Sequence, residues 1–126
     1  TGLTEMEFDE ARVKIHQYIN PAANFANQSE QQRVLVAAVT FFSYWPRRSS
    51  IDFLVAVAGN TTCEDDPREG ALNYLPDAIK DAKDLSNEER KAMAENVVKT
   101  LQGFLPTASE RLKVNIDAAI QALKSP

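Results

Sequence analysis

The chain has 126 residues, of which 44% are hydrophobic and 25% charged, which fits one globular domain with its own core. Its net charge of −4 argues against nucleic-acid binding, because a grip on phosphates requires clustered Lys and Arg. One Cys and one His are too few for a structural zinc site, so neither a metal nor a cofactor is expected.

The first predicted element is a helix that opens at Thr4. Thr4 and Glu7 have the spacing of a capping box, in which each side chain accepts a hydrogen bond from a backbone N–H at the helix start. Leu3 before this cap and Phe8 after it have the spacing of a hydrophobic staple. Apolar residues at helical spacing predict one buried stripe, made of Phe8, Ala11, Ile15, Tyr18 and Ile19. Asn20-Pro21 ends this helix.

Residues 34–45 form the most apolar stretch and carry no charge. A helix that is apolar all round is usually buried, so we expect this stretch to be the central helix of the fold. A second capping-box pattern, Ser29 with Gln32, starts it after a connection over residues 21–28, and Pro46 stops it. The stretch is too short to span a membrane, which takes about 20 apolar residues.

The apolar run 51–58 fits two interpretations. As a helix it would be capped by Ser49 or Ser50 and would end at Gly59 in a left-handed conformation. Periodicity alone cannot separate so short a run from a buried strand. We favour the helix because no other segment offers a strand partner, and we expect a polar loop over residues 60–65.

The next segment predicts two short helices on either side of a proline. Asp66 has the position of a cap, with Pro67 at the first helical position. Pro76 falls inside the apolar stripe that follows, so we expect a kink there and a second short helix over residues 77–84.

Two longer helices complete the chain. Ser86 with Glu89 forms a capping box for the first of them, and Gly103 supplies its stop. Thr107 with Glu110 forms the last capping box. Because the connection between these helices is short, we expect an antiparallel hairpin lying over the central helix.

These patterns together predict an all-α fold. Residues 1–126 would form a single domain, a compact bundle of five to six helices around the central apolar helix 34–45. The prediction depends on agreement between two signals, since each capping pattern comes just before an apolar stripe of helical period.

Trp45, Arg47 and Arg48 form the most suggestive group for binding a partner. Two guanidinium groups beside an aromatic ring can clamp a carboxylate or stack on another protein. The competing interpretation is a solvated turn between two buried helices. Glu64 and Asp65, in the acidic stretch of the 60–65 loop, offer a second surface of opposite charge.

The remaining reactive side chains favour structural roles. His16 lies on a helix beside polar neighbours and has no evident partner to orient it, so we expect a surface or boundary residue and not a general base. Cys63 precedes three acidic residues, which should raise the pKa of its thiol and keep it unreactive. The acidic stretch lacks the alternating ligands and the Gly of a calcium loop.

The sequence leaves the compartment open. A single Cys fits a reducing cytosol by default and fits a disulfide-free lumenal or secreted protein equally well. The start of the chain shows no apolar targeting segment, and it carries no initiator Met. Asn27 and Asn60 each open an N-glycosylation acceptor pattern, which matters only on a secretory route.

The preferred function is a non-enzymatic protein-interaction module, such as an adaptor, an assembly factor or an inhibitor. Catalytic motifs are absent from the sequence, whereas helix surfaces are plentiful. The alternative is a small-ligand or lipid carrier with a pocket inside the bundle, lined by Phe41, Phe42 and Phe53. An enzyme that uses His16 is the third hypothesis. A protein partner is expected, and the long apolar run over residues 34–58 also allows a homodimer.

Overall fold

The computed structural model describes residues 4–125, which form six α-helices and a short 3-10 turn, η1. Their bounds are α1 (Glu5–Tyr18), α2 (Ser29–Ser43), α3 (Arg48–Ala58), α4 (Asp65–Asp81), α5 (Asn87–Phe104), η1 (Leu105–Thr107) and α6 (Glu110–Lys124). The all-α prediction is confirmed, and the run 51–58 belongs to a helix. Leu3, the predicted staple partner of Phe8, lies outside the described residues.

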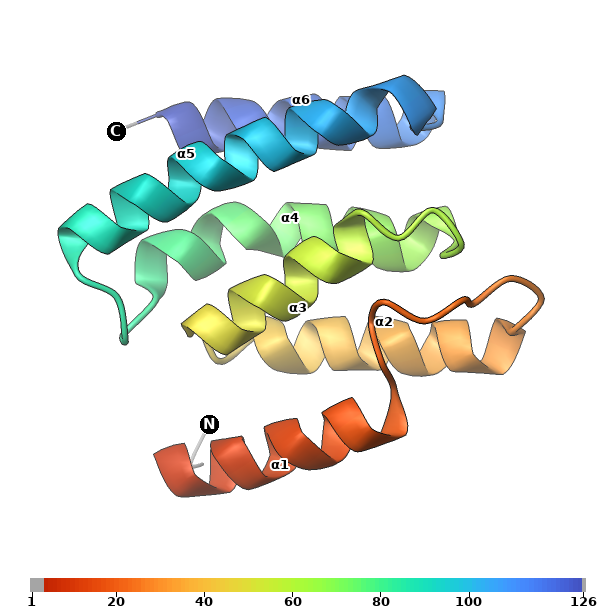
Figure 1. Ribbon diagram of the computed structural model, residues 1–126, viewed down its shortest axis with the longest axis horizontal. Helices are drawn as coiled ribbons and strands as arrows, with labels where there is room; N and C mark the ends of the chain where they lie inside the picture. Colours follow the sequence, from red (N-terminus) through yellow and green to blue (C-terminus); the bar gives the residue numbers. More distant parts are fainter. Residues whose placement is uncertain (1–3, 126) are drawn as a thin grey trace.

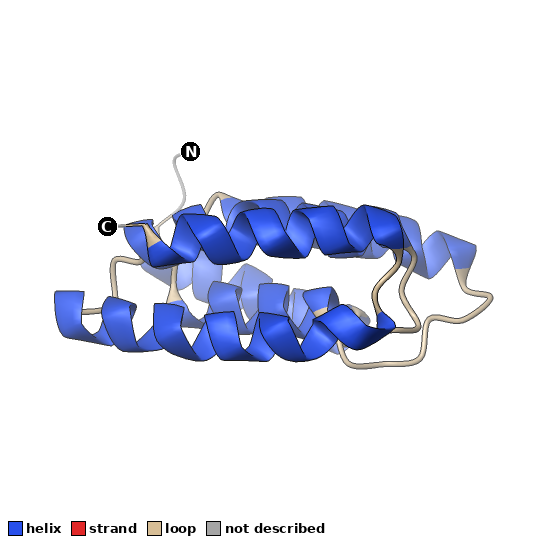
Figure 2. Cartoon of the chain, turned by 90° about the horizontal axis from the view of Figure 1, so that it is seen from above, coloured by secondary structure: helices blue, strands red, loops and turns tan. Residues whose placement is uncertain are grey.

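The helices are stacked as three antiparallel pairs, α1 with α2, α3 with α4, and α5 with α6 (Figure 1). Seen from above, they form two layers (Figure 2). One layer holds α1, α3 and α5, and the other holds α2, α4 and α6. Within the second layer, α4 packs closely against both α2 and α6.

Helix α4 contacts more of the other helices than any other element does, namely α2, α3, α5 and α6. Its inward side chains Leu72 and Leu75 are fully buried. The apolar stretch 34–45 forms the second half of α2 and the turn after it, and it carries much of the aromatic core. The α5–α6 hairpin forms as expected, but it packs on α4 and not on residues 34–45.

Two of the predicted capping boxes are confirmed. The Thr4 hydroxyl accepts from the Glu7 N–H at 3.1 Å, and the Glu7 carboxylate accepts from the Thr4 N–H at 3.2 Å. Ser86 and Glu89 make the same reciprocal pair at the start of α5, at 3.1 and 2.8 Å. Each pair satisfies backbone donors that have no partner within the helix.

The other predicted caps are wrong. Ser29 is the first residue of α2 and caps nothing, because the side chain of Gln32 is used elsewhere. Ser109 caps α6 through its hydroxyl, whereas Thr107 belongs to η1. At α4, Glu64 and not Asp66 occupies the cap position, without a side-chain hydrogen bond.

The start and end of α3 also differ from the prediction. Neither Ser49 nor Ser50 caps this helix; Arg47 occupies the cap position, and Ser50 donates its hydroxyl to the Trp45 carbonyl. Gly59 ends the helix with φ −91°, which is not left-handed. A methyl group at Gly59 would collide with the Phe104 ring, whose Cε1 would be 2.8 Å away, so close packing explains this glycine.

Two expected breaks do not occur where they were predicted. Helix α4 runs through Pro76 to Asp81, so no separate helix forms over residues 77–84. Proline removes one backbone hydrogen bond, but the buried side chains Leu75 and Ile79 on either side hold the helix against the core. Similarly, α5 continues through Gly103 to Phe104.

The predicted stripe of α1 is only partly buried. Phe8 is 1% exposed and Ile19 is 3% exposed, whereas Tyr18 is 68% exposed. Tyr18 is the last residue of α1, where the chain turns away toward α2. No helix among the described residues is long and apolar enough to cross a membrane.

Candidate functional site

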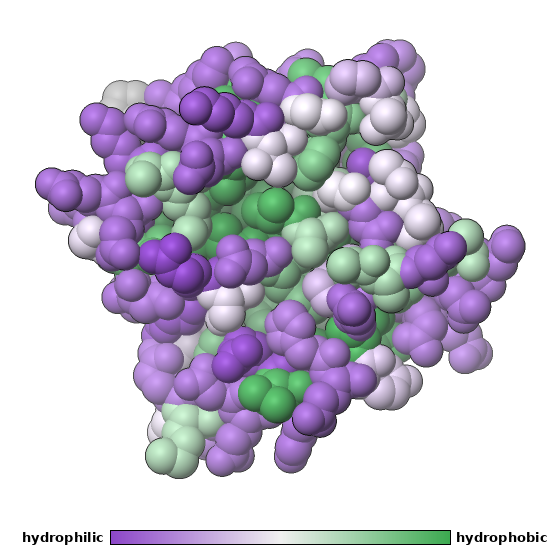
Figure 3. All heavy atoms as spheres, viewed as in Figure 1, coloured by the Kyte–Doolittle hydropathy of each residue, from purple (hydrophilic) through white to green (hydrophobic). Residues whose placement is uncertain are grey.

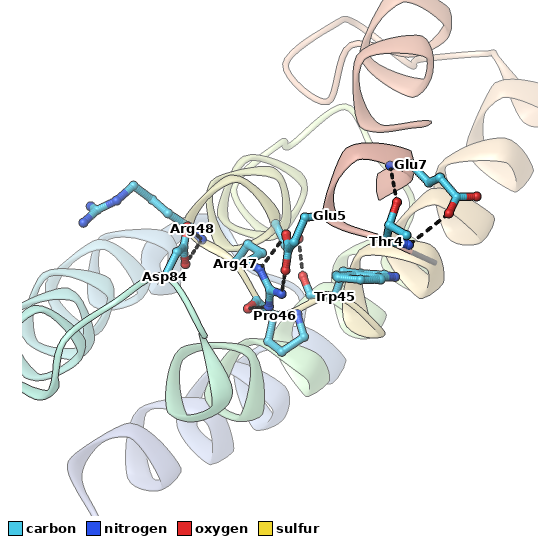
Figure 4. Close-up of polar contacts among 9 residues, drawn as sticks. Thr4, Glu5, Glu7, Trp45, Pro46, Arg47, Arg48 and Asp84 are labelled. Carbon is cyan, nitrogen blue, oxygen red and sulfur yellow. Dashed lines mark hydrogen bonds and ion pairs between the residues drawn. The ribbon is translucent and has the colours of Figure 1, made fainter. Parts of the chain in front are cut away.

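Trp45, Arg47 and Arg48 lie in and just after the turn that joins α2 to α3 (Figure 4). The Trp45 ring stacks on Phe8 of α1, with ring centroids 5.0 Å apart. The Arg47 guanidinium lies over the same ring, with its Cζ 5.1 Å from the centroid. Trp45 is therefore held between an apolar ring and a cation, and its Nε1 has no hydrogen-bond partner among residues 4–125.

Arg47 ties this turn to α1. Its guanidinium forms an ion pair with Glu5 and donates from Nη1 to the Pro46 carbonyl at 2.9 Å (Figure 4). The side chain is only 13% exposed. Hydrogen bonding to the guanidinium also lowers the pKa of the Glu5 carboxyl. These contacts leave Arg47 with a structural role within the chain.

Arg48 is more accessible. Half of its side chain is exposed, and its Nη2 lies 3.1 Å from Oε2 of Glu89 on α5. Its backbone N–H donates to both carboxylate oxygens of Asp84, at 3.0 and 3.2 Å. The Asp84 carboxylate thus accepts a hydrogen bond from the first backbone N–H of α3, as a capping side chain would. Because Asp84 lies 36 residues further along the chain, a local capping pattern does not reveal it.

The predicted acidic surface lies at the opposite end of α3 and is partly engaged within the chain. The Asp65 carboxylate accepts from the Ser109 hydroxyl at 3.0 Å. The backbone N–H of Glu64 donates to the Gln32 side chain, whereas the Glu64 carboxylate is exposed and makes no hydrogen bond or ion pair within residues 4–125. The two predicted surfaces are separated by the length of α3, about 16 Å for its 11 residues. They therefore do not form one site.

The same acidic stretch joins α4 to α6. Arg111 lies 2.7 Å from Asp66 and 2.6 Å from Glu69, and hydrogen bonding to these carboxylates raises the pKa of its guanidinium. The structure thus gives the acidic run a partner inside the fold, in the form of Arg111 and Ser109.

A groove that was not predicted from the sequence runs between α3 and α5. Apolar side chains gather in a hollow between these helices (Figure 3). Its volume is about 380 Å³. Its apolar lining is Ile51 and Val55 from α3 with Ala92, Met93 and Val97 from α5, and its polar lining is Arg48, Asp52, Glu89, Asn96 and Thr100.

The lining residues explain why the groove was missed. Ile51 and Val55 are one turn apart on α3, and Met93 and Val97 are one turn apart on α5. Each pair looks like part of an ordinary buried stripe. The sequence signal for the groove is an additional apolar residue next to the buried stripe of each helix. These residues form a groove only because α3 and α5 are neighbours in space.

Asp52 is the charged side chain of this groove without a partner. It makes no hydrogen bond or ion pair within residues 4–125. Partial burial raises the pKa of its carboxyl, Arg48 opposes that rise, and the nearby Asp84 adds to it. The Asp52 side chain is nevertheless exposed at the edge of the groove, and Arg48 is the nearby cation that favours its charged form.

The carrier hypothesis placed a pocket among Phe41, Phe42 and Phe53. The Phe42 and Phe53 rings are 0% and 1% exposed, and their centroids lie 4.4 Å apart. Phe41 contacts Phe42 edge-on at 5.2 Å. These three side chains therefore pack directly on one another.

His16 lies on α1 with the edge of its ring against Phe53, at 5.4 Å between centroids. Burial against these rings lowers the pKa of its imidazole, and the Arg12 charge lowers it further. His16 is thus an exposed residue whose ring contacts the aromatic core, which agrees with the surface or boundary position predicted from the sequence.

The buried side chains of Gln32 and Arg68 and the partly buried side chain of Asn60 hold the loops, a role that the sequence did not predict for any of them. Gln32 is 6% exposed and donates to the Phe25 carbonyl at 3.2 Å. Arg68 is 5% exposed and donates from Nε to the Ala58 carbonyl at the end of α3. The Asn60 side-chain amide donates to the Pro21 and Ala23 carbonyls in the segment before α2. They satisfy loop carbonyls that the secondary structure leaves unpaired.

Comparison of the chain with protein-family models, with curated proteins and with solved structures gives no match.

Cys63 is expected to react with a neutral thiol reagent at pH 7 about a hundredfold more slowly than free cysteine. Burial raises the pKa of its thiol to about 11, and the side chain is 6% exposed. The direction agrees with the sequence argument, but the cause is burial and not the acidic neighbours, and the Arg68 charge opposes it. Labelling quenched at successive times and analysed by mass spectrometry gives the rate of thiol modification. Labelling as fast in the native protein as in urea would contradict this prediction.

Arg47→Ala is expected to destabilise the fold by about 1–2 kcal/mol, and Arg48→Ala by less than about 0.5 kcal/mol. Arg47 loses its contacts with Glu5, Pro46 and the Trp45 ring, whereas Arg48 loses one half-exposed ion pair. Urea unfolding of the two variants measures the difference. Equal effects would mean that the contacts of Arg47 contribute nothing beyond surface charge.

Proposed function

We propose that the protein is a non-enzymatic protein-interaction module whose partner binds in the groove between α3 and α5. The observation that carries this proposal is the groove itself, an open apolar surface between two helices with polar residues at its edges. Interface cores commonly combine such a surface with Met and Arg, here Met93 and Arg48.

The fold supports this proposal. Helices α3 and α5 both pack on α4, so the fold holds the two walls of the groove on a common helix. Leu72 and Leu75 of α4 are fully buried in the core that supports both α3 and α5. Of the five residues predicted for partner binding, Arg48 lies at this groove, and its contact with Glu89 closes one end.

A photoreactive amino acid placed at position 93 tests the proposal. In a lysate of the cells that make the protein, we expect a defined protein adduct from position 93 and none from position 114, where Val114 is 70% exposed on α6 and is not part of the groove lining. Val55→Glu in the same chain should abolish the adduct, because a buried charge would face the partner. Identical adducts from both positions, or none from position 93, would contradict the proposal.

A further inference from the structure

We propose that the α3–α5 groove receives an amphipathic helix of a partner protein, and that a Lys or Arg of this helix pairs with Asp52. This inference rests on the proposed function and specifies the chemistry of the partner. It is carried by two observations, the parallel arrangement of the lining residues and the charge balance at one end of the groove.

The lining has the shape and period that a helix fits. On α3, the lining residues fall at positions 48, 51, 52 and 55, and on α5 at 89, 92, 93, 96, 97 and 100, so each helix presents one face along several turns. The α5 side runs for about 16 Å, which matches roughly three turns of a docked helix. Such a helix would place apolar residues at spacings of three and four between Val55 and Met93.

The charges near Asp52 favour a basic partner. One cation, Arg48, faces three carboxylates, those of Asp52, Asp84 and Glu89. Arg48 already pairs with Glu89 through its guanidinium, and its backbone N–H already binds Asp84. Asp52 makes no hydrogen bond or ion pair within residues 4–125, and it lies exposed at the edge of an apolar surface, where a cation of the partner could pair with it.

The other end of the groove is lined by neutral polar side chains, so the docked partner helix is expected to carry its basic residue at one end only. Asn96 and Thr100 occupy the α5 side away from Glu89, and the Thr100 hydroxyl donates to the Asn96 carbonyl of its own helix. No charged side chain lines this part of the groove. The position of the basic residue is therefore set by Asp52 alone.

The test uses a displayed library of 16-residue helix-forming peptides. Their apolar stripe is restricted to Leu, Ile, Met, Phe and Val, and the flanking positions are drawn from Lys, Glu, Gln and Ala. Three immobilised targets are selected in parallel: the unmodified protein, Asp52→Lys, and Asp117→Lys as a control. Asp117 is an exposed carboxylate on α6 and is not part of the groove lining. Thermal unfolding first shows that each target is folded.

We expect Lys to be enriched over Glu by about threefold to tenfold at one flanking position on the unmodified and Asp117→Lys targets. Asp52→Lys should reverse this preference. No charge preference, or one that Asp52→Lys leaves unchanged, would overturn the inference. The proposed function would still stand if position 93 yields its protein adduct, so the two failures are distinguishable. Selection of no helix at all, with retention of a small molecule in native mass spectrometry, would overturn both.

Discussion

Replacing Asn60 by Asp is expected to destabilise the fold by about 2–4 kcal/mol, although the two side chains have the same shape. The Asn60 amide nitrogen donates to the Pro21 carbonyl at 2.9 Å and to the Ala23 carbonyl at 2.8 Å. Its oxygen accepts from the Thr62 N–H at 3.0 Å and from the Thr62 hydroxyl. An introduced carboxylate would point an oxygen at the Pro21 and Ala23 carbonyl oxygens, and it would leave the Ala23 carbonyl with only the Thr62 hydroxyl, at 3.3 Å, as a donor.

Urea unfolding at neutral pH measures this loss, with Asn27→Asp as the matched control. Asn27 is exposed in the same connection before α2 and has φ 62°, a conformation that Asn and Asp both tolerate. We expect the control to change stability by less than about 0.5 kcal/mol. Lowering the pH should restore part of the loss in Asn60→Asp, because a protonated carboxyl regains one donor. A loss unchanged by pH would mean that charge and donor count are not its cause.

The same contacts give the Asn60-Thr61-Thr62 stretch a structural explanation. Besides accepting from the Phe25 N–H at 2.9 Å, the Thr62 hydroxyl contacts both Asn60 and the Ala23 carbonyl. A glycan on Asn60 would leave one hydrogen for two carbonyls. The acceptor pattern here is therefore accounted for by the link between the α3–α4 loop and the connection before α2, and it implies nothing about a secretory route.

The helices were predictable because their signals are local. Thr4 with Glu7, and Ser86 with Glu89, satisfy each other within one turn, so four residues of sequence suffice to recognise them. The apolar period of α6 is equally local and places Leu112, Ile116 and Ile120 on one buried face.

Predictions failed where a distant side chain satisfies the group in question. The start of α3 is bonded by Asp84, 36 residues away, and the N–H of Glu64 by Gln32, 32 residues away. Ser29 therefore lacks the reciprocal partner that its spacing with Gln32 suggested. Where a side chain could form several alternative hydrogen bonds, tertiary packing decides which one forms. A local sequence pattern carries no information about that packing.

The candidate site shows the same limit. The sequence drew attention to Arg47 as an exposed cation, yet the partner that covers it is Glu5, 42 residues earlier in the chain. Asp52 attracted no attention, because a single acidic residue in an apolar run is ordinary until its surroundings are known. Its surroundings are set by α5, which places Met93 and Glu89 on the other side of the groove. Arg48 pairs there with Glu89 and not with Asp52.

Replacing Phe8 by Ala is expected to destabilise the docking of α1 by about 3–4 kcal/mol, while the other five helices stay folded. Phe8 is the buried residue of α1, and its ring stacks on Phe41 at 5.7 Å and on Trp45 at 5.0 Å. Helix α1 also packs less closely on its neighbours than the other helices do. Loss of this ring removes the one fully buried side chain of α1 and leaves the partly buried Ile15 as its apolar contact with the core.

Two measurements separate local release of α1 from global unfolding. Trp45 is the single Trp of the chain, so a shift of its fluorescence to longer wavelength reports that α1 has left it. Hydrogen exchange should show fast amides in α1 and unchanged protection in α4. Met6→Ala, on the same helix with Met6 73% exposed, should change neither. Equal loss of protection in α1 and α4 would make α1 an integral part of one cooperative unit, with Phe8 as a member of the common core.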